Sequence, residues 1–98
     1  MSVRRYFVYI LSNRTNSTLY IGMTGDLRQR LLQHREGYSQ FTKRYSVRKL
    51  VYFEVHEDVQ MARQRERTLK RWLRAWKNRL VTEHNPGWLD VSDQIPFD

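Results

Sequence analysis

The sequence predicts a small α+β domain, with a three-stranded sheet flanked by helices in the order β-β-α-β-α-α. Three runs of β-branched and aromatic residues indicate strands. Two other segments place apolar residues at helical spacing. A chain of 98 residues supplies one core and not two. We therefore expect a single domain over residues 1–98, with its core over about 5–88 and a short acidic tail over 89–98.

The first two strands are predicted to form a hairpin. Residues 5–11 and 18–22 are mostly β-branched, aromatic or aliphatic, and the polar residues 12–17 between them are typical of a turn. Gly22 ends the second strand. Because glycine lacks Cβ, the chain can turn sharply there or allow another group to come close.

A short helix is expected next, with Thr24 as its N-cap and Asp26 in its first turn. Its apolar face carries Leu27 and Leu31, spaced one helical turn apart. Residues 38–44 are polar, basic and aromatic, and we interpret them as a surface loop.

Residues 50–55 are predicted to form the third strand, and residues 58 to about 83 are helical in pattern throughout. That helix is much longer than the average, so we expect a kink or break near residues 72–75. Residues 85–87 end it, and we expect Trp88 to pack the chain back onto the domain. The predicted apolar stripe of this long helix comprises Ala62, Leu69, Leu73, Trp76 and Leu80.

Composition excludes several classes of protein. With no cysteine, the chain cannot form a disulfide scaffold, a thiol nucleophile or a cysteine zinc site. The longest apolar run, residues 6–11, is too short to span a membrane, and no signal-peptide pattern follows it. We therefore expect a cytoplasmic protein without a membrane partner, and leave association with the nucleoid open.

Charge favours a polyanionic partner, because 18 Lys and Arg residues face only 10 Asp and Glu, a formal net charge of +8. One arc of the long helix is almost purely basic, which favours phosphate contact over an ordinary solvated face. An amphipathic membrane helix is the other interpretation, but a small domain needs Trp72 and Trp76 for its core. The arc comprises Arg63, Arg67, Lys70, Arg71, Arg74 and Lys77.

Glu66 is the exception on this helix, because it falls at the margin of the apolar stripe. A carboxylate turned toward a core is costly unless it is paired or bound to a metal. Two interpretations are open from the helix alone, an ion pair with Arg30 or Lys70, or a metal ligand. The histidines have no metal-ligand spacing among themselves.

Two short motifs together resemble the paired signature of the GIY-YIG nuclease superfamily: Phe7-Val8-Tyr9 and Tyr20-Ile21-Gly22. The continuation over residues 23–34 has Arg30 and His34 at the family's arginine and histidine positions. Phe7-Val8 replaces the Gly-Ile of the first motif, a variation that keeps the tyrosine.

The resemblance continues to about Trp88. Ala62-x-x-x-Glu66 is similar to the segment that carries the family's metal-binding glutamate, and Asn85 stands at its asparagine position. The match is strongest to the small stand-alone bacterial members. Some members carry a lysine directly after the second motif, where this chain has Met23.

The resemblance implies a metal-dependent DNA endonuclease, acting in repair or in processing of damaged or branched DNA. Glu66 would be the only protein ligand of Mg²⁺ or Mn²⁺, and Tyr9 or Tyr20 would act as, or relay protons for, the general base. Arg30 would hold the scissile phosphate, with His34 and Asn85 supporting it. The alternative is a nucleic-acid-binding module on the same scaffold with little or no catalytic activity.

The partner implied is DNA, whether single-stranded, duplex or branched. A homodimer or a recruiting protein partner is compatible with a domain of this size. The residues expected to contact nucleic acid are Gly22, Thr24, Lys43, Arg63, Arg67, Lys70, Arg71 and Arg74.

Overall fold

A three-stranded antiparallel sheet divides the protein into two layers. The computed structural model describes residues 4–37 and 40–96. The strands are β1 (Tyr6–Ser12), β2 (Leu19–Thr24) and β3 (Lys49–His56), in the spatial order β2-β1-β3. The helices are α1 (Leu27–Arg35), α2 (Gln40–Arg44), α3 (Val59–Arg71), α4 (Arg74–His84) and a 3₁₀ turn, Ser92–Gln94. The predicted fold class is confirmed, with the order β-β-α-α-β-α-α.

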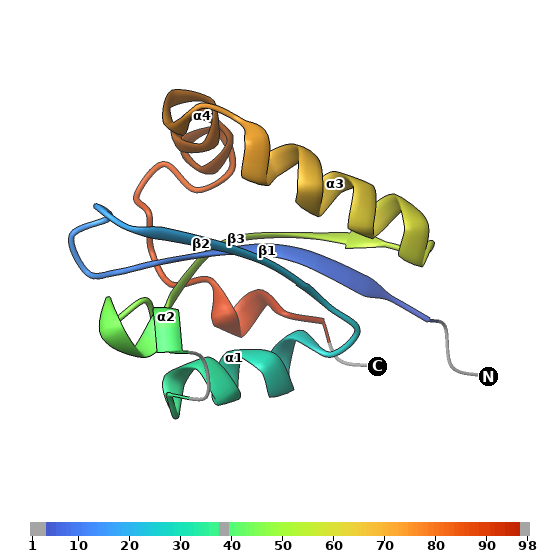
Figure 1. The fold of residues 1–98 in the computed structure, drawn as a ribbon, viewed down its shortest axis with the longest axis horizontal. Coiled ribbons are helices and arrows are strands. Elements are labelled where there is room, and N and C mark those ends of the chain that lie inside the picture. The colour runs from blue at the N-terminus through green and yellow to red at the C-terminus, as the bar shows by residue number, and fades with distance from the viewer. Residues whose placement is uncertain (1–3, 38–39, 97–98) are drawn as a thin grey trace.

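Helices cover both faces of the sheet. Figure 1 shows α3 and α4 on one face, and α1, α2 and the C-terminal segment on the other. β1 is the central strand, so its alternate side chains enter two separate cores. Phe7, Tyr9 and Leu11 pack toward α1, whereas Val8 and Ile10 pack toward α3.

The structure corrects the predicted surface loop, because residues 40–44 form helix α2. A helix of five residues is too short for helical periodicity to be recognised in the sequence. Its one buried residue is Thr42, which faces α1. The first two residues of that predicted loop, Tyr38 and Ser39, lie outside the described residues.

The start of α1 is also corrected. Asp26, not Thr24, is the N-cap, and its carboxylate accepts a hydrogen bond from the Gln29 amide at 3.1 Å. Thr24 is the buried last residue of β2, and its hydroxyl accepts from the Asp26 amide, also at 3.1 Å. The threonine therefore shapes the turn that leads into the helix, and the aspartate caps it.

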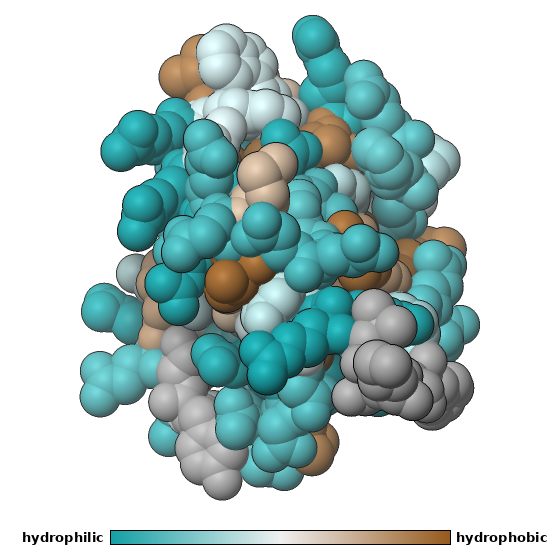
Figure 2. Space-filling view, turned by 90° about the vertical axis from the view of Figure 1, so that its right-hand side faces the viewer, coloured by the Kyte–Doolittle hydropathy of each residue, from teal (hydrophilic) through white to brown (hydrophobic). Residues whose placement is uncertain are grey.

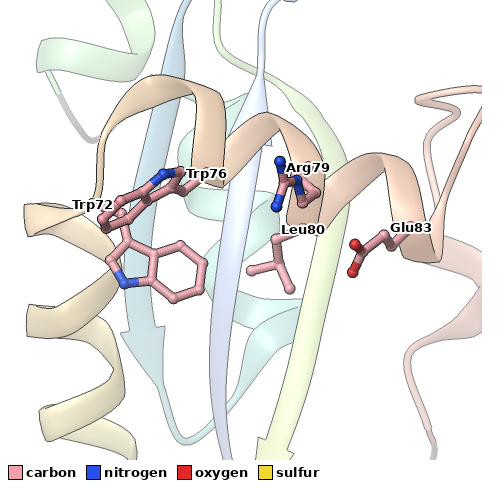
Figure 3. A pocket seen from close by; sticks show the side chains of 5 residues that line it. All are labelled: Trp72, Trp76, Arg79, Leu80 and Glu83. Atoms are coloured by element: carbon pink, nitrogen blue, oxygen red, sulfur yellow. The ribbon is translucent and has the colours of Figure 1, made fainter.

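The expected break in the long helix is confirmed. Trp72 and Leu73 are both extended and separate α3 from α4. The predicted apolar stripe was drawn across this break and is wrong for two of its members, because Leu73 is 63% exposed and Trp76 is 50% exposed. Ala62, Leu69 and Leu80 do pack in the core between the helices and the sheet. In Figure 3, Trp72, Trp76, Arg79, Leu80 and Glu83 line a shallow pocket where the two helices meet.

The C-terminal segment belongs to the layer under the sheet. The amide of Val91 donates to the carbonyl of Leu50 at 2.8 Å, and Ile95 is buried in the core that includes Tyr9. Trp88 packs against the opposite core, beside α4. No helix in the described parts of the chain has the length and apolarity to cross a membrane.

Truncating the buried side chain of Ile95 tests how much the C-terminal segment contributes to the stability of the fold. We expect Ile95→Ala to lower the free energy of unfolding by about 2–5 kcal/mol, because the substitution leaves a cavity under the sheet. Leu89→Ala is the control, since Leu89 is 68% exposed, and should change it by less than about 0.5 kcal/mol. Urea denaturation measures both, and equal effects would contradict the prediction.

Candidate active site

The site is built around Tyr9, on the central strand. Tyr9 pairs with Gly22 on the edge strand β2, so both residues face the same side of the sheet. The tyrosine is 1% exposed, and its ring extends across Gly22. A Cβ at position 22 would lie 2.4 Å from the Tyr9 hydroxyl. Only a residue without a side chain leaves room for this ring.

His34 holds the hydroxyl of Tyr9 from the helical layer. Tyr9 Oη and His34 Nε2 lie 2.9 Å apart, and His34 Nδ1 lies 3.2 Å from Thr42 Oγ1. His34 and Thr42 are both buried. The three side chains form a continuous chain of hydrogen bonds from β1 through α1 to α2, so the ring orientation of His34 is set at both nitrogens.

Tyr20 lies against the same histidine and is partly exposed. Its ring centroid is 4.9 Å from that of His34, edge to face, and 6.3 Å from that of Tyr9. The structure therefore brings both predicted tyrosines together with His34. Tyr9 lies inside the protein, and Tyr20 lies between it and solvent.

Charges from two other elements act on this cluster. Arg30, exposed on α1, and Glu66, on α3, both influence the ionisation of Tyr9. Glu66 belongs to the layer on the far side of the sheet. Helix α3 packs over β1 and β2, so its carboxylate acts on Tyr9 from across the sheet.

Burial raises the pKa of Tyr9 well above its ordinary value; Tyr20 raises it further, Arg30 acts in the opposite direction, and Glu66 also raises it. Tyr9 is therefore a neutral phenol at physiological pH. Burial lowers the pKa of His34, and the positive charge of Arg30 lowers it further. His34 is thus a neutral imidazole, with one nitrogen able to accept a proton.

Glu66 has an ion pair within its own helix. Lys70 Nζ lies 3.4 Å from Glu66 Oε2, which makes Lys70 one of the two partners considered for it. Exposed pairs with this spacing contribute only about 0.3–0.5 kcal/mol, and the lysine side chain is 53% exposed. The pair therefore contributes little to the stability of the fold.

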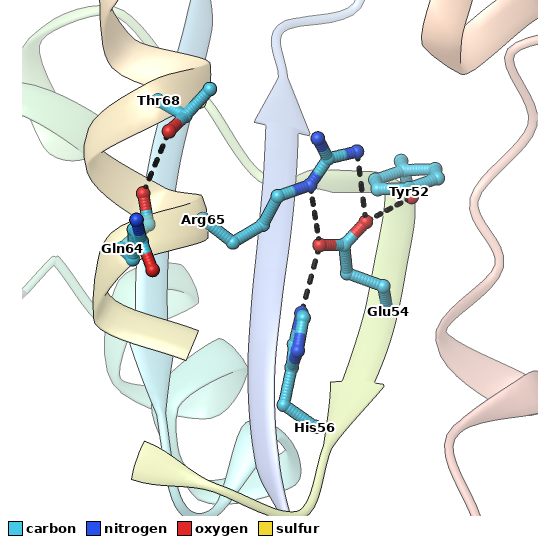
Figure 4. A network of polar contacts seen from close by, with 6 residues as sticks. All are labelled: Tyr52, Glu54, His56, Gln64, Arg65 and Thr68. Carbon is cyan, nitrogen blue, oxygen red and sulfur yellow. Dashed lines mark hydrogen bonds and ion pairs between the residues drawn. The ribbon is translucent and has the colours of Figure 1, made fainter. Parts of the chain in front are cut away.

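The orientation of α3, and so of Glu66, is fixed by the preceding residue. Figure 4 shows Arg65 reaching from α3 to Glu54 on β3. Arg65 Nε donates to Glu54 Oε1 at 2.8 Å; His56 Nε2 lies 2.9 Å from the same oxygen, and Tyr52 donates to the other. Burial raises the pKa of Glu54, but these hydrogen bonds outweigh it, and that pKa lies below its usual value.

A divalent metal at Glu66 would have few protein ligands. Among the described residues, no group of three His, Cys, Asp or Glu side chains is arranged to hold a metal. A single carboxylate suits Mg²⁺, which keeps several of its waters when bound. The carboxylate of Glu66 therefore fits a hydrated hard cation. It does not fit zinc, which takes three or four protein ligands.

Two residues expected in the site have structural contacts. Asn85 donates through Nδ2 to the carbonyls of Val51 and Leu89, at 3.0 and 2.8 Å, and its Oδ1 accepts from the Leu89 amide. Its carboxamide therefore fastens β3 to the C-terminal segment. Arg74 donates to the carbonyls of Asn16 and Ser17, which ties α4 to the β1–β2 turn.

Of the other residues expected to contact nucleic acid, Gly22 and Thr24 are buried, whereas the lysines and arginines remain accessible. The exposed ones are Lys43, on α2, and Arg63, Arg67, Lys70 and Arg71, on α3. Figure 2 shows the end of the molecule where α3 begins, and the described residues there are largely hydrophilic. Hydrophobic groups appear on this face only in small separate areas, which is compatible with a charged ligand.

Sequence reasoning missed Thr42, which orients His34, and Phe41, whose ring lies 5.8 Å from that of Tyr20. Both lie in the segment interpreted as a loop. The alternation of aromatic and basic residues in that segment is the signal that could have indicated a role beside the site.

A methyl group at Gly22 tests the close approach of Tyr9. We expect Gly22→Ala to lower the free energy of unfolding by about 1–3 kcal/mol, because the Tyr9 ring must move out of a packed core. Gly25→Ala is the matched control: a Cβ there would lie 3.9 Å from its nearest neighbour, the Arg5 carbonyl. Chemical denaturation compares them, and a harmless Gly22→Ala would contradict the packing.

The pH dependence of His34 follows from its lowered pKa. As pH falls, the imidazole of His34 is protonated in the unfolded chain before it is protonated in the folded protein. The stability that the neutral histidine contributes is therefore complete above about pH 6.5 and is lost progressively below it. We expect the NMR titration of His34 to lie below 6.5 and to move upward in Arg30→Gln. Arg14→Gln, in the β1–β2 turn, removes an equal charge as a control; equal shifts in both variants would refute the role of Arg30.

Comparisons with known proteins show the family of this chain. Residues 5–80 match the GIY-YIG catalytic domain. A UPF0213 protein of Clostridium perfringens is 36% identical over 77 residues, covering 78% of this chain and 82% of that protein. Another, from Natronomonas pharaonis, is 34% identical over 79 residues, covering 80% and 92%.

The fold is also that of a solved structure. The solution NMR structure of a UPF0213 protein from Bacillus halodurans superposes with a TM-score of 0.58 at 22% identity, covering 95% of this chain and 99% of that one. With a catalytic-domain match over most of its length and two relatives above 30% identity, this chain belongs to the GIY-YIG family, among the small UPF0213 proteins.

Proposed function

We propose that this protein is a divalent-metal-dependent DNA endonuclease, a phosphodiester hydrolase. The observation that carries the proposal is the cluster that Tyr9, Tyr20 and His34 form on the α1 side of the sheet. The charges of Arg30, on α1, and Glu66, on α3, both act on Tyr9. A core aromatic cluster alone would require neither the cation nor the carboxylate. The biological setting we propose is repair or processing of damaged or branched DNA.

Arg30 is the group that binds the scissile phosphate. Its guanidinium is always charged, is exposed beside the buried tyrosine, and can donate two parallel hydrogen bonds to a phosphate. A fixed cation there stabilises the negative charge that develops as water attacks phosphorus. Together with burial, which is the larger cause, the same charge lowers the pKa of His34, so Arg30 both acts on the site and binds the substrate.

The two tyrosines have different roles. Because Tyr9 is held as a phenol, it serves as a proton donor or relay and not as the resting base. His34 is within hydrogen-bonding distance to exchange a proton with it, and Thr42 fixes the histidine. Tyr20 lies nearer solvent, on the path by which water reaches the site.

Glu66 would hold the Mg²⁺ or Mn²⁺. When bound, such an ion lowers the pKa of its waters and stabilises negative charge on phosphate oxygens. In the hydrolysis that we propose, the oxygen of water bonds to phosphorus and the P–O3′ bond breaks. The 3′ oxygen takes up a proton, which leaves 5′-phosphate and 3′-hydroxyl ends.

A DNA cleavage assay of the Glu66→Gln variant tests the proposed role of the glutamate. We expect the variant to lose metal-dependent cutting of single-stranded, duplex and branched DNA while its free energy of unfolding changes by less than about 0.5 kcal/mol, since only a weak ion pair is removed. Gel assays with Mg²⁺, Mn²⁺ or EDTA measure the activity.

Lys70→Gln is the matched variant, because it breaks the same ion pair and leaves the carboxylate. It should retain metal-dependent cleavage at saturating DNA, with any effect confined to salt-dependent affinity. Cutting by Glu66→Gln at the rate of the unmodified protein would end the role of the glutamate. Tight, salt-sensitive binding without cutting on any substrate would instead favour a nucleic-acid-binding module.

A further inference from the structure

A series of aromatic rings leads from the candidate site to the surface. Tyr20 packs against His34 on one side and against Phe41 on the other, with a ring-centroid distance of 5.8 Å to Phe41. Tyr45 continues the series, 4.9 Å from Phe41. The last two rings are carried by α2 and the residue that follows it.

The outer two rings are not needed by the core. Phe41 and Tyr45 are each 43% exposed, and neither belongs to the hydrophobic clusters on either face of the sheet. The contribution of α2 to the interior is Thr42, which is 0% exposed and contacts His34. One short helix therefore turns a polar side chain inward and an aromatic one toward solvent, the reverse of ordinary amphipathic packing.

Positive charge surrounds these rings. The guanidinium of Arg44 lies 5.5 Å from the centre of the Tyr45 ring, and Lys43 is exposed on the same helix. Exposed aromatic rings interleaved with cations are the combination that binds single-stranded nucleic acid, because bases stack on the rings and phosphates pair with the cations. Two half-exposed rings are far too small for a stable protein interface, which buries about 800 Å² on each partner.

We propose that Phe41 and Tyr45 form a platform on which unpaired bases of the substrate strand stack, connected through the ring of Tyr20 to the candidate site at His34. The proposal rests on the proposed nuclease function and adds a binding site for the nucleobases. Each stacked base should strengthen binding roughly 5- to 150-fold, whatever its sequence, since every base presents an aromatic face.

Oligonucleotides with and without bases isolate the stacking. The experiment measures, by fluorescence anisotropy in EDTA, binding of a labelled thymidine oligonucleotide and of an abasic oligonucleotide with the same number of phosphates. Charge is equal in the two, so their affinity ratio reports contact with bases. We expect the unmodified protein to prefer the oligonucleotide with bases by at least 5-fold, and the Phe41→Ala/Tyr45→Ala double variant to bind both equally.

Three controls make the result specific. Tyr45→Phe keeps the ring and should keep the preference. Met61→Ala removes an exposed apolar side chain on α3, where Met61 is 57% exposed, and should also keep it. Circular dichroism of the double variant should match the unmodified protein, because neither altered side chain belongs to a core cluster; its melting temperature should fall only modestly, since two half-exposed ring contacts are lost.

A double variant that still prefers the oligonucleotide with bases would overturn the platform, as would an unmodified protein with no preference. Self-association that disappears in the double variant, seen by sedimentation, would assign the rings to a second copy of the chain instead. These outcomes are separate from the cleavage assay: binding in EDTA requires no catalysis, so the platform can fail while Glu66-dependent cutting stands, or be observed in a protein that does not cut.

Discussion

The close approach of the Tyr9 ring to the backbone of Gly22 is the constraint on which the site depends. The edge strand β2 carries no side chain at the position opposite Tyr9. A Cβ there would collide with the ring and hydroxyl of Tyr9, which stay buried. Here the missing side chain brings that hydroxyl within hydrogen-bonding distance of His34 and within the electrostatic influence of Arg30 and Glu66. The glycine therefore has a steric role, since its backbone does not adopt a positive φ.

The second constraint is the position of α3. Glu66 comes from the layer opposite the tyrosines, so a small rotation of α3 would turn the carboxylate away from the edge of the sheet. Arg65 opposes that rotation through its two hydrogen bonds to Glu54 on β3. Its guanidinium also lies over the ring of Trp72, 5.2 Å from its centre, at the end of the same helix. The acceptor oxygens of Glu54 are shared with Tyr52 and His56, so the anchor is a partly buried and fully paired network, of the kind that holds one arrangement.

Much of the fold could be predicted from the sequence, because its elements have strong local patterns. The three strands are aromatic and β-branched runs, and the break between α3 and α4 follows from a helical pattern longer than one helix should be. What failed depended on tertiary contacts. Helix α2 packs on α1 with Thr42 hydrogen-bonded to His34, and no periodicity in five residues indicates that contact. Ile95 is buried because residues after Trp88 pass under the sheet, and an acidic segment with one isoleucine gives no sign of it.

The candidate site, too, could be predicted only in the part that does not depend on tertiary contacts. A family resemblance assigns residue types to positions, so it could place Tyr9, Tyr20, Arg30, His34 and Glu66 in one site. It could not indicate which atoms are free to act. Asn85 matches its position in the motif, yet both ends of its carboxamide are engaged by backbone groups. Arg74 continues the basic arc in sequence, yet the break after α3 directs its guanidinium to the β1–β2 turn.

Whether a polar side chain can bind a ligand depends on whether its hydrogen-bonding groups are already engaged within the fold. Arg30 differs from Arg74, whose guanidinium is engaged by backbone carbonyls. It lies one helical turn before a buried histidine and is itself exposed, with its charge acting on both Tyr9 and His34. A phosphate bound there would offset that charge and so raise the pKa of His34 toward its ordinary range. Because Arg30 also lowers the pKa of Tyr9, against the larger effect of burial, the same phosphate would raise that pKa too, so substrate binding would favour the protonated form of both partners in the Tyr9–His34 hydrogen bond.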